Sequence, residues 1–246
     1  MQNCYEKLCE LKKLTDDIGQ IYGTEDFAIY LYSLVRMFKP KTILELGTGL
    51  GTTSLWMALA LEENQEGIIH TIDNGSEWQS LKQAKERYRQ FYNDDYKLFV
   101  EGLIQHFNFN NVKFYNEQID NFNLNNIDIL FSDFSHDTFS ILNCFAMYLS
   151  KMSENSYIFI DSASTHYTSR LTILSLLDML NANKIPKTLL EMVPITQKEK
   201  FKEKVSQSSF QLIDIIENKN RNQNSTACIK INPIDLFPNP RINIRF

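Results

Sequence analysis

The 246-residue sequence predicts an α/β fold with a doubly wound, mostly parallel sheet whose last two strands form an antiparallel hairpin. Three observations support this prediction. Short apolar runs alternate with helical patterns along the chain, as they do where helices cover a parallel sheet. A glycine-rich turn over residues 47–51 joins the first apolar run to a helix. Acidic residues close three of the later runs, and ligands of α/β sheets bind at the carboxyl ends of strands.

Two helices are expected before the first strand, within residues 1–40. Apolar side chains recur at helical spacing over residues 4–18. A second, largely apolar helical pattern covers residues 27–38, and Pro40 ends it. We expect the second helix to pack on the sheet just ahead of the first strand.

The core of the fold is expected between residues 42 and 232. Five strands alternate with helices and a hairpin closes the sheet, which makes seven strands in all. The expected strands cover residues 42–46, 68–72, 112–115, 127–132, 156–160, 210–217 and 225–231. The expected helices cover residues 54–61, 139–149, 169–182 and part of 196–209.

Two segments depart from this alternation. Residues 76–107 are long for a single crossover, so we expect a helical insertion with helices near residues 82–89 and 96–107. The tail over residues 233–246 has no clear regular pattern. The whole chain, residues 1–246, is thus predicted to be a single domain.

Composition narrows the range of partners. A formal charge of −5 and a pI near 5.5 give no electrostatic reason to expect nucleic acid or an anionic membrane. No window approaches the roughly 20 apolar residues of a membrane span. The start of the chain has no secretory pattern, and the four cysteines show no metal or disulfide spacing. We therefore expect a cytoplasmic protein with a small-molecule substrate, and the sequence leaves the oligomeric state open.

The glycine turn and Asp73 indicate a nucleotide ligand. Asp73 lies 22 positions after Gly51, at the end of the second expected strand. A carboxylate there can accept hydrogen bonds from both hydroxyls of a ribose, as a site for NAD or for S-adenosylmethionine requires. Gly47, Gly49 and Gly51 form GxGxG, whereas a dinucleotide fingerprint is GxGxxG. Glu45 before the turn suits a ligand with a cationic centre and is awkward beside a pyrophosphate, which favours S-adenosylmethionine.

Residues 43–53 resemble motif I of the class I S-adenosylmethionine-dependent methyltransferases, and the strand pattern is similar to that family over residues 22–232. The form Glu-Leu-Gly-Thr-Gly-Leu-Gly-Thr-Thr is most similar to the small-molecule O-methyltransferase branches. The resemblance implies a Rossmann-like sheet and S-adenosylmethionine as cofactor. It further implies that Gly47 to Gly51, including Thr48 and Gly49, line the methionine moiety and that Thr53 binds its carboxylate. Asp73 would hold the ribose, and Gln118 would lie near the adenine.

Asp133 and Asp161 stand 28 positions apart, each at the end of an expected strand. In the catechol O-methyltransferase-like branch, similar acids and an asparagine after the second bind a divalent cation. Ser162 occupies that last place here and is a poorer ligand, although Mg²⁺ keeps several waters and needs only one or two carboxylates. The alternative is that Asp133 orients the cofactor or substrate through hydrogen bonds and that Asp161 caps the following helix.

His136 follows Asp133 by three positions, in an Asp-x-x-His pattern that resembles the branch that methylates sugars and other natural-product hydroxyls. A neutral imidazole could take the proton from an acceptor hydroxyl as the methyl group moves. The alternatives are a substrate contact or a structural hydrogen bond. His136 and Asp133 are therefore the candidate catalytic residues.

The sequence thus predicts an enzyme that transfers a methyl group from S-adenosylmethionine, in line, to a hydroxyl of a small molecule. No Asn/Asp-Pro-Pro-Tyr follows the fourth expected strand, which disfavours methylation of amino groups on DNA bases or glutamine. Two alternatives stay open. One is another transferase of the same fold, acting on nitrogen or moving an aminopropyl group. The other is a relative that binds the cofactor or a partner without catalysis.

Overall fold

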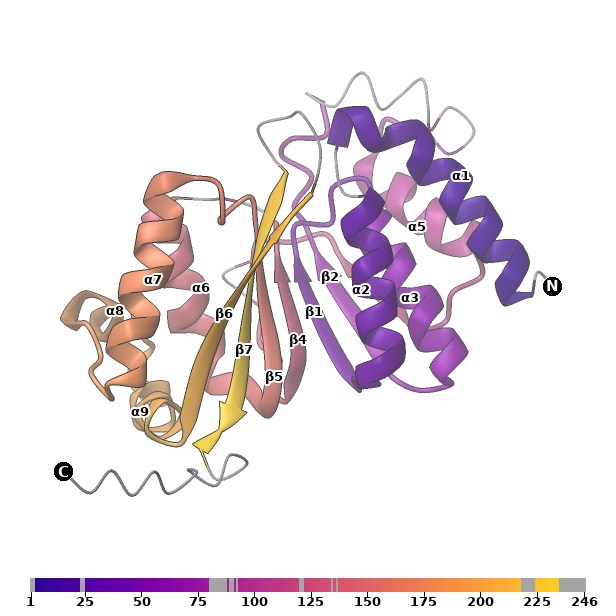
Figure 1. Ribbon diagram of the computed structural model, residues 1–246. Helices are drawn as coiled ribbons and strands as arrows, with labels where there is room; N and C mark the ends of the chain where they lie inside the picture. The colour runs from indigo at the N-terminus through magenta and orange to yellow at the C-terminus, as the bar shows by residue number, and fades with distance from the viewer. Residues whose placement is uncertain are drawn as a thin grey trace. The chain divides into compact units, whose positions relative to one another are not determined.

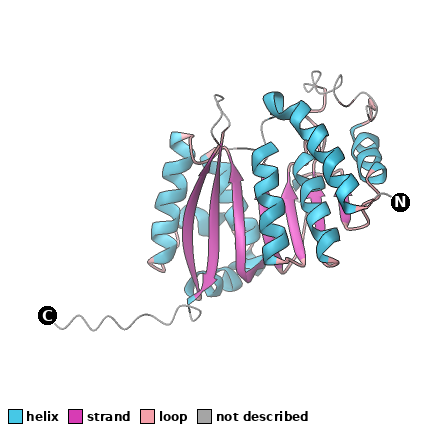
Figure 2. Ribbon diagram, turned by 45° about the vertical axis from the view of Figure 1, so that its right-hand side comes forward, coloured by secondary structure: helices cyan, strands magenta, loops and turns pink. Residues whose placement is uncertain are grey.

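The computed structural model describes residues 3–22, 25–79, 88, 91, 93–119, 122–133, 135, 137–217 and 224–234. Within these ranges the strands form a seven-stranded sheet in the order β3-β2-β1-β4-β5-β7-β6, with helices flanking it (Figures 1 and 2). The first three strands pair in parallel, and β7 runs antiparallel to both β5 and β6. The sheet confirms the predicted fold class.

The strands agree closely with the predicted ranges. Four of the predicted strands begin and end at the expected residues, whereas β5 starts four residues earlier than predicted. The extra residues of β5 include an exposed polar stretch, which carries no apolar pattern that would predict a strand. The strands are β1 Thr42–Leu46, β2 Ile68–Ile72, β3 Val112–Tyr115, β4 Ile127–Ser132, β5 Met152–Asp161, β6 Ser208–Ile216 and β7 Ser225–Pro233.

The helices agree less closely. The first continues through Gly19 to Tyr22, because one glycine costs a helix only about 1 kcal/mol. The short α8 lies in a segment with no predicted helix, and the helix predicted near residues 82–89 falls outside the described residues apart from Tyr88. The helices are α1 Cys4–Tyr22, α2 Glu25–Phe38, α3 Thr52–Asn64, α5 Tyr96–His106, α6 Thr138–Tyr148, α7 Tyr167–Asn181, α8 Lys187–Met192 and α9 Lys198–Ser206, with 3-10 turns at Leu149–Lys151 and Ile195–Gln197. None of the helices described is long and apolar enough to cross a bilayer.

The chain divides into two compact units. The first comprises Met1–Asn123, Leu130–Phe134 and Glu217–Asn224, and the second comprises Leu124–Ile129, Ser135–Ile216 and Ser225–Phe246. The single-domain organisation expected for residues 1–246 stays a prediction, as do its parts at residues 1–40, 42–232 and 233–246.

The first unit is built around β1. Its apolar residues Ile43, Leu44 and Leu46 are fully buried. Every residue of α3 from Thr52 to Leu61 is buried as well, and α2 lies against this helix beside β1 and β2 (Figure 1). A helix that is buried on all sides belongs to the core of its unit. The loop that joins β1 to α3 therefore starts and ends next to buried residues.

The second unit is organised by the ladder of β5, β7 and β6. The side chain of Asn181, at the end of α7, brackets Phe210 on β6 because its amide donates to the Phe210 carbonyl and accepts from the Phe210 N–H, both at 2.8 Å. Arg170 on α7 pairs with Asp214 on the same strand. These polar contacts fix α7 along the hairpin that was predicted from the sequence.

Candidate functional site

The glycine loop follows β1 at the carboxyl end of the strand. Gly47, Gly49 and Gly51 have φ angles of 95°, 53° and 75°, in the left-handed region that glycine adopts without strain. The N–H of Gly47 donates to the carbonyl of Ile72 at 2.9 Å, which ties the start of the loop to the end of β2. The tight turn predicted for these glycines is thus present, and it lies beside the second strand.

Asp73 bridges this loop to the loop that follows β2. Its own N–H donates to the carbonyl of Tyr115 at the end of β3, at 3.1 Å. One carboxylate oxygen, Oδ2, accepts from the N–H of Gly49 at 3.0 Å, and the other, Oδ1, accepts from the N–H of Gly75 at 2.8 Å. A carboxylate has about four acceptor positions, so each oxygen can accept a further hydrogen bond. The structure therefore brings the predicted acid and the predicted glycine loop together.

Glu45 lies beneath the loop and is only 1% exposed. The hydroxyls of Thr71, at 2.5 Å, and of Ser54 both donate to its Oε2, and the Thr71 oxygen lies 2.6 Å from the hydroxyl oxygen of Thr48. Burial raises the pKa of Glu45 to about 7; the two hydroxyl hydrogen bonds act against this and the charge of Asp73 adds to it. Glu45 thus links β1 to β2 and α3, and it reaches the loop through Thr71 and Thr48. Its contact with a ligand stays a prediction.

The remaining predicted cofactor residues lie at different depths. Thr53 is in the first turn of α3 and 6% exposed. Gln118 follows β3 and is exposed. Asn116, two residues earlier, contacts the site, because its amide donates to the backbone carbonyl of Asp73 at 2.9 Å; the place of Gln118 near the adenine stays a prediction. No sequence pattern singles out Asn116, which stands among many asparagines.

Asp133 lies at the end of β4, next to the glycine loop. Its N–H donates to the carbonyl of Leu46 at 2.8 Å, so the ends of β1 and β4 meet within the first unit. His136 lies outside the described residues. The nearby Asp137 caps α6, accepting from the N–H of Ser140 at 3.0 Å, and hydroxyl groups of Ser135 and Ser140 hold the pKa of its carboxyl well below the usual range. Its hydrogen bonds thus give Asp137 a structural role at the start of the helix.

Asp161 belongs to the second unit and is 9% exposed. Its Oδ2 accepts from the hydroxyl of Ser162 at 2.8 Å, and its Oδ1 accepts from the hydroxyl of Thr226 at 3.3 Å. The alternative in which Asp161 caps the following helix is wrong, because α7 begins at Tyr167 and has His166 at its N-cap. Among the residues that the structure describes, no group of three or more histidine, cysteine or acidic side chains could hold a metal ion.

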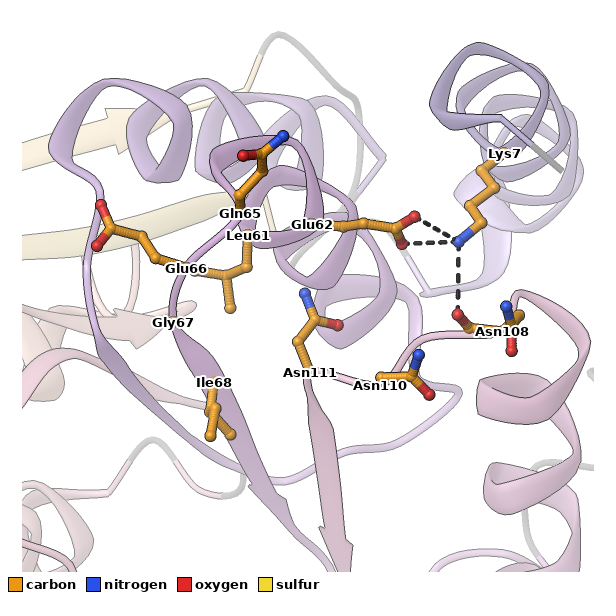
Figure 3. Close-up of a pocket in the computed structure, with 10 residues that line it drawn as sticks. All are labelled: Lys7, Leu61, Glu62, Gln65, Glu66, Gly67, Ile68, Asn108, Asn110 and Asn111. Carbon is orange, nitrogen blue, oxygen red and sulfur yellow. Dashed lines mark hydrogen bonds and ion pairs between the residues drawn. The ribbon is translucent and has the colours of Figure 1, made fainter. Parts of the chain in front are cut away.

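A cavity of about 390 Å³ in the first unit lies at the amino ends of the parallel strands, opposite the glycine loop (Figure 3). It opens at the start of β2, near Ile68, and at Asn111, just before β3. Lys7 enters it from α1 and donates to both oxygens of Glu62, at 2.7 and 2.8 Å. Since ligands of α/β sheets bind at the carboxyl ends of strands, this cavity at their amino ends is separate from the candidate site.

The comparisons with known proteins agree with the fold. Residues 44–163, about half of the chain, match a protein-family model described as "Methyltransferase domain". No curated protein matches the sequence.

Three solved structures illustrate the likeness of fold. Cofactor-bound Rv0187 from MTB has a TM-score of 0.53 at 12% identity, covering 91% of this chain and 88% of that one. An O-methyltransferase from Bacillus cereus in complex with SAH has a TM-score of 0.51 at 14% identity, covering 92% and 90%. A structure from Klebsiella pneumoniae described as a candidate O-methyltransferase has a TM-score of 0.53 at 13% identity, covering 92% and 90%. The family match and the fold confirm the predicted resemblance to class I S-adenosylmethionine-dependent methyltransferases.

Proposed function

We propose that this chain, which has the fold of the class I methyltransferases, transfers a methyl group from S-adenosylmethionine to a hydroxyl of a small molecule. The observation that carries the proposal is the position of Asp73. Its carboxylate is held by backbone N–H groups of Gly49 and Gly75, and both oxygens keep acceptor positions for a ribose. This arrangement supports a nucleoside ligand at the carboxyl ends of β1 and β2.

The residues of the first unit fit S-adenosylmethionine. The loop is built from three glycines with positive φ, so backbone N–H groups can approach a ligand without a Cβ in between. In the proposed complex Gly47 to Gly51 hold the methionine moiety, Thr53 its carboxylate and Asp73 the ribose. When bound, S-adenosylmethionine supplies an electrophilic methyl group on a cationic sulfur. The ionised form of Glu45 would stabilise that positive charge through the field beneath the loop.

The acceptor side of the proposal rests on Asp133 and His136. Asp133 lies at the end of β4, beside the end of β1. In our proposal the His136 imidazole accepts the proton of the acceptor hydroxyl, and Asp133 orients the cofactor or substrate by hydrogen bonds. A base of this kind contributes typically 10²- to 10⁴-fold in rate, whereas holding the acceptor oxygen in line can contribute up to roughly 7–11 kcal/mol.

The need for a divalent cation stays a prediction. Asp133 and Asp161 are its candidate ligands, and both oxygens of Asp161 already accept hydroxyl hydrogen bonds. A required cation predicts that EDTA abolishes turnover, that Mg²⁺ restores it, and that the affinity for S-adenosylhomocysteine stays the same. Turnover that persists in EDTA would remove the cation from the proposal.

The proposal is tested by incubating the protein with methyl-labelled S-adenosylmethionine and matched pairs of small molecules that carry a hydroxyl or an amine at the same position. We expect label in the hydroxyl compounds as methyl ethers. At S-adenosylmethionine concentrations well below the wild-type KM, Asp73→Ala should reduce transfer by about 10- to 100-fold. The control Glu66→Ala, which removes an exposed carboxylate at the amino ends of the strands, should leave transfer unchanged. Label that enters only the amines would overturn the assignment to oxygen.

A further inference from the structure

Tyr96, the first residue of α5, reaches the glycine loop from the inserted segment. Its hydroxyl donates to the carbonyl of Gly49 at 2.9 Å, and the side chain is 7% exposed. The N–H of the same glycine donates to Asp73. The nitrogen and the carbonyl of Gly49 are thus held by two different side chains, so neither of the peptide groups that flank its Cα can turn freely.

The ring of Tyr96 also packs against the second loop that Asp73 holds. Gly75 has a φ of 72°, and a Cβ added there would lie 2.6 Å from a ring carbon of Tyr96. The ring therefore lies directly on the backbone of Gly75, whose N–H donates to the other oxygen of Asp73. Tyr96 contacts both backbone segments that the carboxylate bridges.

Tyr96 itself is firmly placed. Its ring lies 5.4 Å from that of Trp78 and 5.8 Å from that of Phe114, measured between centroids. Asp95 caps α5 by accepting from the N–H of Leu98 at 3.2 Å, which fixes the turn that carries Tyr96. Two turns further along the helix, Leu103 packs 3.6 Å from the position of a Cβ at Gly51. Residues near both ends of α5 thus contact the glycine loop.

We propose that Tyr96 is a positioning residue for the cofactor, because it holds the Gly49 peptide and, through it, the carboxylate of Asp73 in the orientation that binds the ribose. This inference rests on the proposed function of the site. Groups that are held in the bound geometry before the ligand arrives lose less freedom on binding, which raises affinity. The inserted segment therefore takes part in binding the methyl donor, although residues 76–107 lie outside the glycine motif.

The expected size of the effect follows from the single hydrogen bond involved. A neutral hydrogen bond contributes about 0.5–1.5 kcal/mol, which corresponds to about 2- to 12-fold in an equilibrium constant. Tyr96→Phe removes the hydroxyl and keeps the ring in place. We expect it to weaken S-adenosylhomocysteine binding by about 3- to 10-fold and to raise KM for S-adenosylmethionine by a similar factor. At saturating cofactor kcat should change little, because the hydroxyl that is removed donates to the glycine loop.

The matched control is Tyr32→Phe. Tyr32 lies on α2 in the same unit, and its hydroxyl donates to Glu63 at 2.7 Å, away from the glycine loop. Each variant removes one tyrosine hydroxyl with one hydrogen bond, so both should lower Tm. A merely structural role for Tyr96 predicts that the two variants bind S-adenosylhomocysteine alike once they are folded. Our proposal predicts that only Tyr96→Phe weakens binding.

Calorimetric titration of wild type and both variants, with Tm measured on the same samples, decides the matter. Weaker binding by Tyr96→Phe alone supports the inference. If Tyr96→Phe binds with the wild-type Kd, or if Tyr32→Phe weakens binding equally, the inference is overturned while the proposed function stands. If the wild type itself does not bind S-adenosylhomocysteine, the proposed function fails and the inference fails with it.

Discussion

At the scale of single residues, the carboxylate of Asp73 links two loops through the backbone N–H groups of Gly49 and Gly75. Its part in the site could be predicted because the evidence is local: an acid at the end of an apolar run, at a set spacing from GxGxG. The glycines could be predicted for the same reason. Tyr96 and Asn116 could not, because each reaches the site from a segment whose own sequence has no relation to the motif.

The protonation of Glu45 gives a prediction about pH. Its pKa in the folded protein, about 7, lies above the ordinary value of 4.5, so ionisation is disfavoured in the folded state. The contribution of Glu45 to the free energy of unfolding is therefore fully present below about pH 4.5, and it is lost as the pH rises to about 7. Since one pKa unit corresponds to about 1.4 kcal/mol, the loss is on the order of 3 kcal/mol.

Glu45→Gln should remove this dependence, because the amide oxygen can still accept from Thr71 and Ser54 but carries no charge. Urea unfolding of both proteins between pH 5 and pH 8 would measure it. As the pH rises, the free energy of unfolding of the variant should increase relative to that of the wild type. A difference that stays constant over this range would show that Glu45 is ionised throughout.

At the scale of elements, strands were predicted better than helices. Strands β1 to β4 are short apolar runs that are separated by polar segments. The residues at which they begin and end can therefore be predicted from the local sequence. The helix α8 and the start of β5 lack apolar periodicity of their own and form because tertiary packing outweighs weak local preference. The two contacts of α5 with the glycine loop also result from tertiary packing. They depend on how the helix docks and not on its own sequence pattern.

The docking of α1 on α3 gives a prediction at this scale. The Lys7 side chain is 2% exposed and donates to both oxygens of Glu62, and its ammonium lies 4.7 Å from the centre of the Phe109 ring. Hydrogen bonds to charged groups contribute about 1.5–3 kcal/mol each, and the partial exposure of Glu62 reduces this. We expect Lys7→Ala to lower the free energy of unfolding by about 2 kcal/mol.

Chemical unfolding with Lys97→Ala as the control would check this. Lys97 pairs with Glu101 on α5 at 3.8 Å, but both side chains are about half exposed, and pairs of that kind contribute at most about 0.5 kcal/mol. Equal losses for the two variants would mean that the Lys7 pair does not hold α1 in place.

At the scale of the whole molecule, the sheet order and the family match place this chain among the class I methyltransferase folds. The sequence predicted this class because its evidence is spread along the chain: a glycine turn, an acid after the second strand and a closing hairpin. We expect the acceptor of the proposed reaction to be specified by segments with the least recognisable pattern, including residues 76–107. The proposed methyl donor can thus be predicted from a recognisable motif, whereas the acceptor cannot.

The separate roles that we propose for Asp73 and His136 give a prediction for the whole reaction. Loss of the ribose acid should weaken S-adenosylhomocysteine binding by about 10- to 100-fold, because hydrogen bonds to a charged acceptor are lost. Loss of the imidazole in His136→Ala should slow turnover by about 10²- to 10⁴-fold and leave cofactor affinity unchanged. Single-turnover kinetics with calorimetry on both variants measures the two effects. Equal effects of both variants on affinity would contradict this division of roles.

The most direct test of the central claim is calorimetric titration of the wild-type protein with S-adenosylhomocysteine and, separately, with NAD. The structure of the loop over residues 47–51 and the position of Asp73 predict saturable one-to-one binding of S-adenosylhomocysteine, its marked weakening in Asp73→Ala, and no heat of binding with NAD. Saturable binding of NAD with no response to S-adenosylhomocysteine would contradict the assignment of this site to a methyl donor.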